Sequence, residues 1–184
     1  MAKIKQIICI SLVLLTLTTK GQDLILGAER TNAYLPLLIG KDIAILGNQT
    51  SMIGNTHLVD SLLDLELNII KVFSPEHGFR GKADAGASIK DTIDIKTGLP
   101  IISLYGKNKK PTKKQLDEVD ILIFDIQDVG ARFYTYISTL HYVMDAAGEN
   151  NIKLIILDRP NPNGHYIDGP IRKKGYESFV GMHP

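Results

Sequence analysis

The sequence predicts an α/β protein with a Rossmann-like, doubly wound fold, in which a mainly parallel sheet carries helices on both faces. Two observations lead to this prediction. Five short runs that are nearly continuous in Ile, Leu, Val and Phe recur along the chain, and segments with helical patterns separate them. Strands that are apolar on both faces are typical of parallel sheets, and regular alternation of strand and helix gives right-handed βαβ units. The five predicted strands are Asp42–Leu46, Leu67–Phe73, Leu99–Leu104, Asp120–Asp125 and Lys153–Leu157.

Three helices are predicted between these strands. Thr56–Asp64 follows a loop, and Thr112–Glu118 carries Thr112 and Gln115 at the spacing of a capping box. The longest helix is expected from about Ala131 to Asn150, because apolar residues recur there at helical spacing on one face. These residues are Phe133, Ile137, Leu140, Met144 and Ala147.

The first 22 residues are predicted to be a signal peptide. Lys3 and Lys5 precede an apolar run over 7–17, and a polar stretch follows it. This is the pattern of a secretory leader, and the run is short for a membrane span. We therefore expect an exported protein, periplasmic or extracellular, with no stable membrane insertion after cleavage; a retained single-helix anchor is the alternative.

The remaining chain divides into two parts. Residues 23–160 form the predicted Rossmann-like catalytic domain. Two prolines in the segment 158–164 exclude regular structure there, and no helix or strand pattern closes the chain after it. We interpret residues 161–184 as the start of a linker or second domain in a truncated sequence.

Composition excludes several classes of function. The chain has 21 Lys and Arg against 20 Asp and Glu, and loss of the leader removes lysines, so charge gives no case for nucleic-acid binding. Cys9 is the only cysteine and lies in the leader, which excludes a disulfide framework and a thiolate zinc site. Because paired-histidine spacing and glycine-rich nucleotide loops are also lacking, we expect neither a metal nor a cofactor.

Polar side chains follow every predicted strand. In an open parallel sheet, ligands bind beyond the carboxyl ends of the strands, so these side chains predict a concave polar site. The segments concerned are 47–51, 74–81, 105–106, 125–132 and 158–159.

The segment after the second strand holds the sharpest candidates. Glu76 and His77 lie between Pro75 and Gly78, so a tight turn can present both side chains at the strand end. A carboxyl group that is partly desolvated in a crevice has a raised pKa and can donate a proton near neutral pH. The structural alternative is an ion pair between Glu76 and Arg80, and spacing leaves both interpretations open.

A second acidic group precedes the longest predicted helix. Asp125 ends an apolar strand, where a charge without a partner is costly, so it needs either a partner or a catalytic role. Asp128 either caps the helix or takes part in catalysis. Arg132 and Arg159 can each hold a carboxylate with two hydrogen bonds, and that carboxylate belongs either to a ligand or to a nearby aspartate.

Aromatic, amide and histidine side chains complete the candidates. Tyr134 and Tyr136 are expected on the first turns of the helix, where they either stack on a sugar or border the core. Asn48 either binds a ligand or closes the turn after the first strand, and the turn is favoured. His57 and His141 are predicted to be ordinary helix residues.

Four blocks of sequence, taken in order, resemble the exo-β-N-acetylmuramidases of the NamZ/YbbC type. The resemblance covers about residues 24–184 and is specific as a combination. It implies a Rossmann-like N-terminal domain, a second domain, and an active site in the cleft between them. The four blocks are Gly47–Ser51, Val72–Gly81, Phe124–Tyr136 and Leu157–Gly164.

The resemblance implies a glycosidase that releases N-acetylmuramic acid from the non-reducing end of peptidoglycan fragments by cleaving a β-1,4 bond. Glu76 is then the leading acid/base, and His77 sets its hydrogen bonding. Asp125 or Asp128 is the second carboxylate, or it orients the substrate's own acetamido group. One arginine reads the lactyl carboxylate of the sugar. The predicted substrate-binding residues are Asn48, Arg80, Gln127, Arg132, Tyr134, Tyr136 and Arg159.

Two other functions remain open. The same polar edge suits an exported sugar- or muropeptide-binding protein, in which Glu76 and Asp125 only accept hydrogen bonds from hydroxyl groups. A metal-dependent phosphoesterase that uses Asp125, Asp128 and His77 ranks last.

Overall fold

A computed structural model describes residues 24–81 and 91–183 of the chain. The predicted leader therefore lies outside the described residues. Among the helices that are described, none combines the length and apolar character that crossing a membrane requires.

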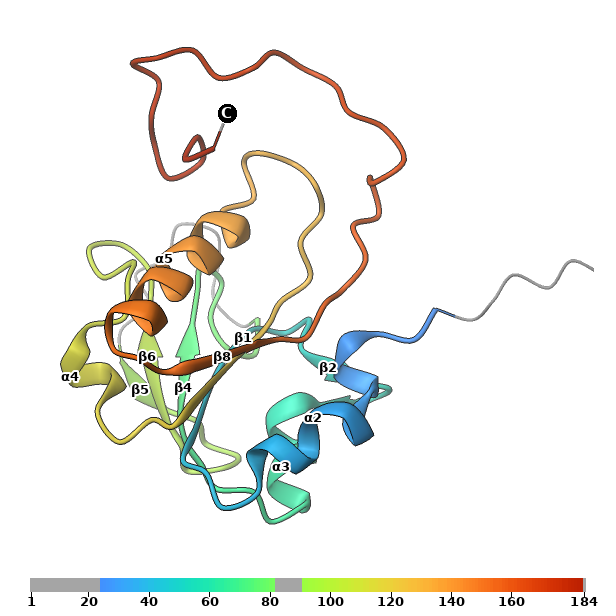
Figure 1. Cartoon of the computed structure of the whole chain (residues 1–184), viewed down its shortest axis with the longest axis vertical. Helices are drawn as coiled ribbons and strands as arrows, with labels where there is room; N and C mark the ends of the chain where they lie inside the picture. The colour runs from blue at the N-terminus through green and yellow to red at the C-terminus, as the bar shows by residue number, and fades with distance from the viewer. Residues whose placement is uncertain (1–23, 82–90, 184) are drawn as a thin grey trace, which may run out of the picture.

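A six-stranded, mainly parallel sheet forms the centre of the fold (Figure 1). Its spatial order is β5-β6-β4-β1-β7-β8, and only β5 runs antiparallel to its neighbour. The parallel strands therefore extend from β1 in one direction through β4 and β6, and in the other through β7 and β8. This reversal at β1 is the order of a doubly wound sheet. The strands are β1 (Ile43–Gly47), β4 (Ile69–Ser74), β5 (Thr92–Ile93), β6 (Pro100–Ser103), β7 (Ile121–Asp125) and β8 (Lys153–Ile156).

Helices cover both faces of the sheet, as the sequence predicts. Successive side chains of a strand point to opposite faces, so Ile43 and Ile45 of β1 pack into one apolar core and Ala44 and Leu46 into another. The first core lies under α2 and α3, and the second lies under α4 and α5 (Figure 1). The elements outside the sheet are η1 (Gly27–Glu29), α2 (Thr31–Leu38), α3 (Leu58–Asp64), α4 (Lys113–Leu116), α5 (Tyr136–Glu149) and the hairpin β2 (Met52–Ile53) with β3 (Thr56–His57).

The five predicted strands are all present, with ends shifted by one or two residues. The predicted capping box is also confirmed, since Thr112 and Gln115 each accept a hydrogen bond from the other's backbone N–H. The short strand β5 and the β2–β3 hairpin are additions that the apolar runs did not indicate, because each contributes only two residues per strand.

The longest helix departs from its prediction in start and in phase. It begins at Tyr136 rather than near Ala131. Phe133 lies in the preceding loop with 77% of its surface exposed. Ile137 and Met144 are also about half exposed, whereas Val143 is buried. The prediction followed the largest apolar side chains, but smaller residues face the sheet and let the helix pack closely against it. The residues that α5 buries are Tyr136, Ser138, Thr139, Val143, Ala146 and Ala147.

The helix predicted over Thr56–Asp64 begins two residues late, at Leu58, and His57 is its N-cap. The Nδ1 atom of His57 accepts a hydrogen bond from the backbone N–H of Val59. The prediction that His57 is an ordinary helix residue is therefore wrong. Its ring is buried and joins α3 to the neighbouring loops.

Candidate active site

The loop after β1 forms one side of the polar site at the carboxyl edge of the sheet. The side-chain oxygen of Asn48 accepts hydrogen bonds from the backbone N–H and the hydroxyl of Thr50, at 2.8 and 2.6 Å. The backbone N–H of Asn48 donates to the hydroxyl of Ser51. Asn48 thus closes the turn, which was the favoured interpretation. Its Nδ2 atom is fully buried and has no hydrogen-bond partner of regular geometry among the described residues.

The segment after β4 presents Glu76 on a tight turn. The backbone N–H of Gly78 donates to the carbonyl of Pro75, and His77 occupies the third position of the turn with a φ of 71°. Glycine favours that left-handed conformation, and a residue with a side chain pays roughly 1–2 kcal/mol to adopt it. The turn leaves Glu76 partly exposed beside Tyr105. Hydrogen bonding to the Glu76 carboxylate raises the pKa of the Tyr105 phenol.

Arg80 does not pair with Glu76. Its guanidinium contacts the carboxylates of Asp60 and Asp94 instead. The structural alternative for Glu76, an ion pair with Arg80, is therefore wrong. Because two carboxylates occupy the guanidinium, the structure also argues against Arg80 as a reader of the substrate's carboxylate.

Asp125 and Arg159 form a buried ion pair at the end of β7. The Nε and Nη2 atoms of Arg159 donate to the two carboxylate oxygens at 2.6 and 3.0 Å, and Nη2 also donates to the carbonyl of Met52. The side chain of Asp125 is fully buried and that of Arg159 is 5% exposed. Burial raises the pKa of Asp125, and Arg159 opposes the shift.

This pair settles two open alternatives. Arg159 neutralises a nearby aspartate, as its structural interpretation proposed, so its guanidinium is not presented to a ligand. Asp125 has a partner and no accessible surface. The structure therefore argues against the prediction that Asp125 is a catalytic carboxylate, because a buried, paired group cannot reach a substrate in this conformation.

Gln127 ties the neighbouring loops together. Its backbone N–H donates to the hydroxyl of Thr50, and its side-chain amide donates to the carbonyls of Asp128 and Pro160. The predicted substrate-binding role of this side chain therefore competes with hydrogen bonds that it already makes within the protein.

Asp128 remains an available acid at this edge. Its Oδ2 atom accepts from the backbone N–H of Gly130 at 3.0 Å, while Oδ1 is buried and has no partner among the described residues. The helix-capping alternative is wrong, since α5 begins eight positions further on, at Tyr136. The turn at Gly130, with a φ of 67°, keeps the segment before α5 out of the helix.

The hydroxyl of Tyr136 lies where the loops after β1, β4 and β7 meet. Burial raises the pKa of this phenol, Glu76 and Asp128 raise it further by their charge, and Asn48 opposes the shift. Three side chains from three different strand ends thus act on one buried group. Of the two interpretations of Tyr136, the structure supports the one that places it at the core rather than on a sugar, because its ring is 7% exposed and packs in the core. Tyr134, 46% exposed, keeps a surface for stacking.

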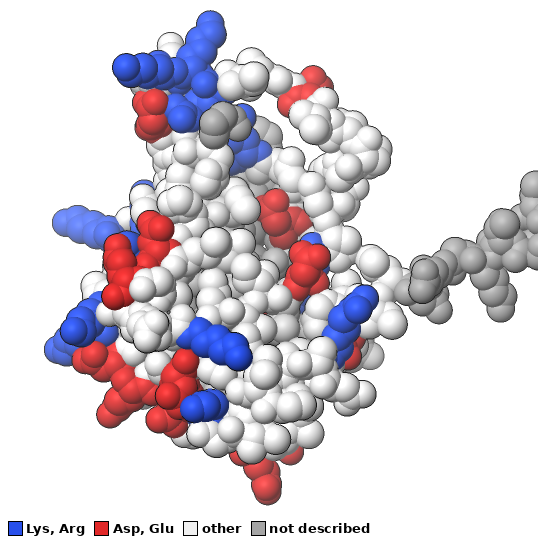
Figure 2. Space-filling view, in the orientation of Figure 1, with Lys and Arg blue, Asp and Glu red and all other residues white. Residues whose placement is uncertain are grey.

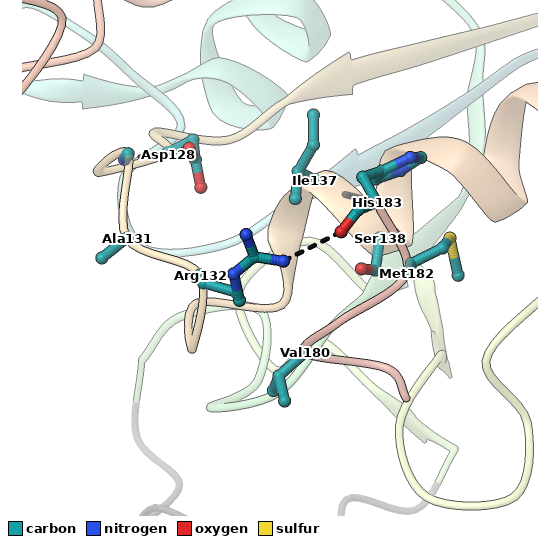
Figure 3. A pocket seen from close by; sticks show the side chains of 9 residues that line it. Asp128, Ala131, Arg132, Ile137, Ser138, Val180, Met182 and His183 are labelled. Carbon is teal, nitrogen blue, oxygen red and sulfur yellow. Dashed lines mark hydrogen bonds between the residues drawn. The ribbon is translucent and has the colours of Figure 1, made fainter. Parts of the chain in front are cut away.

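A pocket of about 290 Å³ lies next to Asp128 (Figure 3). Asp128 and Arg132 lie on one side of it and the C-terminal tail on the other. The Nη1 atom of Arg132 donates to the carbonyl of His183 at 2.9 Å, and no other hydrogen bond of this guanidinium appears among the described residues. Lys and Arg side chains gather on the tail, at the top of Figure 2. The tail residues that line the pocket are Val180, Met182 and His183.

The structure thus brings some predicted residues together and separates others. Asn48, Glu76 and Asp128 follow β1, β4 and β7 at the carboxyl edge of the sheet, and Asp128 lines pockets with Tyr136 and with Arg132. His77 is part of the same turn as Glu76, but among the described residues no hydrogen bond or ion pair of its side chain links it to the others. Within the described residues, no group of three or more His, Cys, Asp or Glu side chains is arranged to hold a metal ion.

Sequence reasoning missed Tyr105, Asp60 and Asp94. Tyr105 follows the third predicted strand and was noted only as part of a strand end, although that position placed it near Glu76. Asp60 and Asp94 contact the Glu76 segment through Arg80. No local pattern in the sequence marks either aspartate as a partner of Arg80.

The fold and the site define a mainly parallel α/β domain whose acidic site lies beyond the carboxyl ends of its strands. The chain belongs to the family described as "Exo-beta-N-acetylmuramidase NamZ, N-terminal", whose model matches residues 43–184. This membership agrees with the family resemblance of the four sequence blocks.

Three relatives support the assignment. The chain is 51% identical over 156 residues to the peptidoglycan beta-N-acetylmuramidase NamZ of Bacillus subtilis, an alignment that covers 82% of this chain and 37% of that protein. Two crystal structures of DUF1343 family proteins from Bacteroides fragilis each match with a TM-score of 0.76. One is 53% identical, covering 87% of this chain and 41% of that chain; the other is 40% identical, covering 85% and 40%. The chain thus spans about two fifths of the length of these relatives.

Proposed function

We propose that the protein is an exo-acting β-N-acetylmuramidase, a glycosidase that releases N-acetylmuramic acid from the non-reducing end of peptidoglycan fragments. Glu76 and Asp128 are its two carboxyl groups. The observation that carries the proposal is that Glu76 and Asp128 follow the parallel strands β4 and β7, so both lie at the carboxyl edge of the sheet. Membership in the NamZ family and the activity named for the Bacillus subtilis relative support it.

Each residue has a stated role in this proposal. Glu76 protonates the leaving oxygen, because it is the partly exposed carboxyl group on a rigid turn. Asp128 is the second carboxylate that glycoside hydrolysis requires, or it orients the acetamido group of the substrate. Arg132 binds the lactyl carboxylate, which distinguishes muramic acid from glucosamine, and Tyr134 offers its exposed ring to a sugar face.

The proposal extends to location and fold type. The basic and apolar pattern of the first 22 residues supports export of the protein from the cytoplasm. Export would bring the protein to the place where peptidoglycan fragments occur. The strand order supports the Rossmann-like description, since reversal at β1 places a crevice between the carboxyl ends of β1 and β7.

The test replaces Glu76 by Gln in the full-length gene product and measures hydrolysis of a chromogenic β-glycoside of N-acetylmuramic acid. General acid catalysis contributes about 10²–10⁴-fold, so kcat should fall by at least 100-fold while the protein stays folded. Glu118→Gln is the matched control, because Glu118 is an exposed glutamate at the opposite, amino end of β7. Its kcat should stay within twofold of the unmodified protein.

Two outcomes would reject the proposal in different ways. Near-normal turnover of the Glu76→Gln protein would remove Glu76 from the acid role. Tight calorimetric binding of the intact glycoside, without product, by the unmodified protein would favour the sugar-binding alternative over a glycosidase.

A further inference from the structure

A cluster of four charged side chains lies directly after the Glu76 turn; we call it the Arg80 clamp. The guanidinium of Arg80 donates to Asp60 at 2.9 and 3.2 Å and to Asp94 at 2.9 and 2.7 Å. Lys96 donates to Asp60 at 2.7 Å. Asp60 and Asp94 are 8% and 5% exposed, so water screens these pairs weakly. The clamp is made of Arg80, Asp60, Asp94 and Lys96.

The clamp joins three parts of the chain. Asp60 belongs to α3, and Asp94 directly follows β5. The hydroxyl of Thr97 donates to Asp94 at 2.8 Å and holds its second carboxylate oxygen in place. A guanidinium offers a rigid planar fork of donors to two carboxylates at once, whereas the ammonium group of a lysine is a single point charge without that geometry. Arg80 therefore fixes the end of the Glu76 segment to two separate elements.

A second line of contacts runs from the clamp to Asn48. The guanidinium of Arg80 lies 4.8 Å from the ring centre of Phe79, which is buried. Phe79 in turn meets the edge of His57 at 4.6 Å between ring centres. The Nε2 atom of His57 lies 2.9 Å from the carbonyl of Asn48, and Nδ1 already accepts a hydrogen bond, so Nε2 carries the proton and donates. The Glu76 segment is thus packed against the loop that forms the other wall of the site.

The turn itself needs such support. His77 adopts a left-handed backbone conformation, and Gly78 follows with a φ of 80°. A residue with a side chain keeps that conformation only when the surrounding structure imposes it. Pro75 and Phe79 are buried on either side of the turn, and Arg80, three residues beyond His77, adds the charged tether. Loss of the Arg80 contacts would remove that tether and leave the Pro75–Arg80 segment less firmly held.

We propose that Arg80 is a positioning residue for Glu76: by holding Asp60 and Asp94 together, it fixes the turn that aims the Glu76 carboxyl group at the site. This inference rests on the proposed function. It assigns Arg80 no contact with the substrate. The competing interpretation is that the clamp only stabilises the fold.

The test compares Arg80→Lys with the unmodified full-length gene product in the chromogenic assay. Lysine keeps the charge but loses the two-carboxylate geometry. We expect kcat to fall at least tenfold, KM to stay within threefold, and thermal unfolding to show a fully folded protein at the assay temperature. Arg172→Lys is the matched control, because Arg172 pairs with Glu177 in the C-terminal tail, and it should change neither constant.

A double substitution separates positioning from stabilisation. If Arg80 acts through Glu76, then Arg80→Lys added to Glu76→Gln should lower kcat no further, because the group that it positions is already lost. Additive losses would overturn the inference, and so would an Arg80→Lys protein with kcat within twofold of normal. A loss of activity that disappears on cooling, in step with the folded fraction, would show the purely stabilising role.

Amide hydrogen exchange on the 184-residue chain tests the same inference without activity. In the Arg80→Lys protein, the amides of residues 76–79 should exchange at least tenfold faster, while those of β1 and β7 keep their rates. Equal protection in both proteins, or faster exchange throughout the sheet, would overturn the positioning role. If the unmodified full-length protein cleaves no muramic acid glycoside, the proposed function is rejected. The exchange measurement would still decide whether the Arg80 clamp holds the Glu76 turn in place.

Discussion

Replacing Arg159 by Met should destabilise the domain more than any other single loss of charge at the site. The change removes two hydrogen bonds to Asp125 and one to the carbonyl of Met52. Since the Asp125 side chain is fully buried, its carboxylate would remain in the interior with no counter-ion. Removing one partner of a buried ion pair costs about 3–5 kcal/mol, which is a large part of the 5–15 kcal/mol that stabilises a typical domain.

Urea unfolding followed by circular dichroism measures this loss. Arg172→Met is the control: its partner Glu177 is 56% exposed, so solvent screens the pair and its loss should cost much less than the loss of Arg159. A pH series adds a second check. Burial raises the pKa of Asp125, so lowering the pH neutralises the stranded carboxyl group, and the deficit of Arg159→Met should shrink.

The double variant Asp125→Asn with Arg159→Met completes the cycle. It removes the stranded charge, so it should recover part of the stability that Arg159→Met loses. A cost below about 1 kcal/mol for Arg159→Met at pH 7 would refute the reasoning. A deficit that is the same at pH 4 and pH 7 would do so as well.

Two further predictions concern a buried histidine and the specificity arginine. Burial has the largest effect on the pKa of His57 and lowers it. The Asn48 carbonyl, Asp60 and Asp94 raise this pKa, whereas Arg80 lowers it further. The unfolded chain therefore binds the extra proton, and stability should fall as the pH drops below 6.5, by up to about 1.4 kcal/mol per pH unit. Urea unfolding of His57→Gln should show less of this slope in the same range, whereas His141→Gln, with a ring 45% exposed, should retain it. Calorimetry on the full-length Arg132→Ala protein should show a loss of about 1.5–3 kcal/mol in binding N-acetylmuramic acid and a smaller loss for N-acetylglucosamine; equal losses for both sugars would contradict lactyl recognition.

The parallel strands were predictable because each is buried on both faces and therefore reads as a continuous apolar run. The phase of α5 was not, because Thr139, Val143 and Ala146 face the sheet while the larger Ile137 and Met144 face outward. A helix that packs closely on a sheet selects small side chains at the contact. An assignment that follows hydrophobic bulk is then only partly right: Leu140 packs against the core and Ala147 is buried, but Ile137 and Met144 are about half exposed.

Sequence-based prediction was also limited for the charged groups of the site. Position at a strand end correctly marked Glu76, Asp125 and Asp128 as neighbours of one edge, since topology alone brings these loops together. Partner choice did not follow from spacing: Arg80 lies four residues from Glu76 yet pairs with carboxylates 20 and 14 residues away. Which charged groups form ion pairs depends on how the loops fold over the sheet. Residue types and their spacing in one sequence do not reveal that folding.

The crevice at the reversal of strand order constrains where a substrate can lie. Its floor is filled by the protein's own contacts: Ser51 donates to the backbone carbonyl of Asp125, Gln127 donates to Thr50, and Arg159 bridges Asp125 and Met52. Under the proposed function, a sugar would therefore bind above these contacts rather than between the ends of β1 and β7.

Among the described acids at this edge, Glu76 after β4 and Asp128 after β7 are partly exposed, and Asp158 after β8 is exposed. Under the proposed function, Asp128 rather than Asp125 is the second carboxyl group beside Glu76, because Asp125 is fully buried and paired with Arg159. Asp128→Asn should therefore cost activity with the fold intact, in contrast to substitutions of the Asp125–Arg159 pair, which act on stability first.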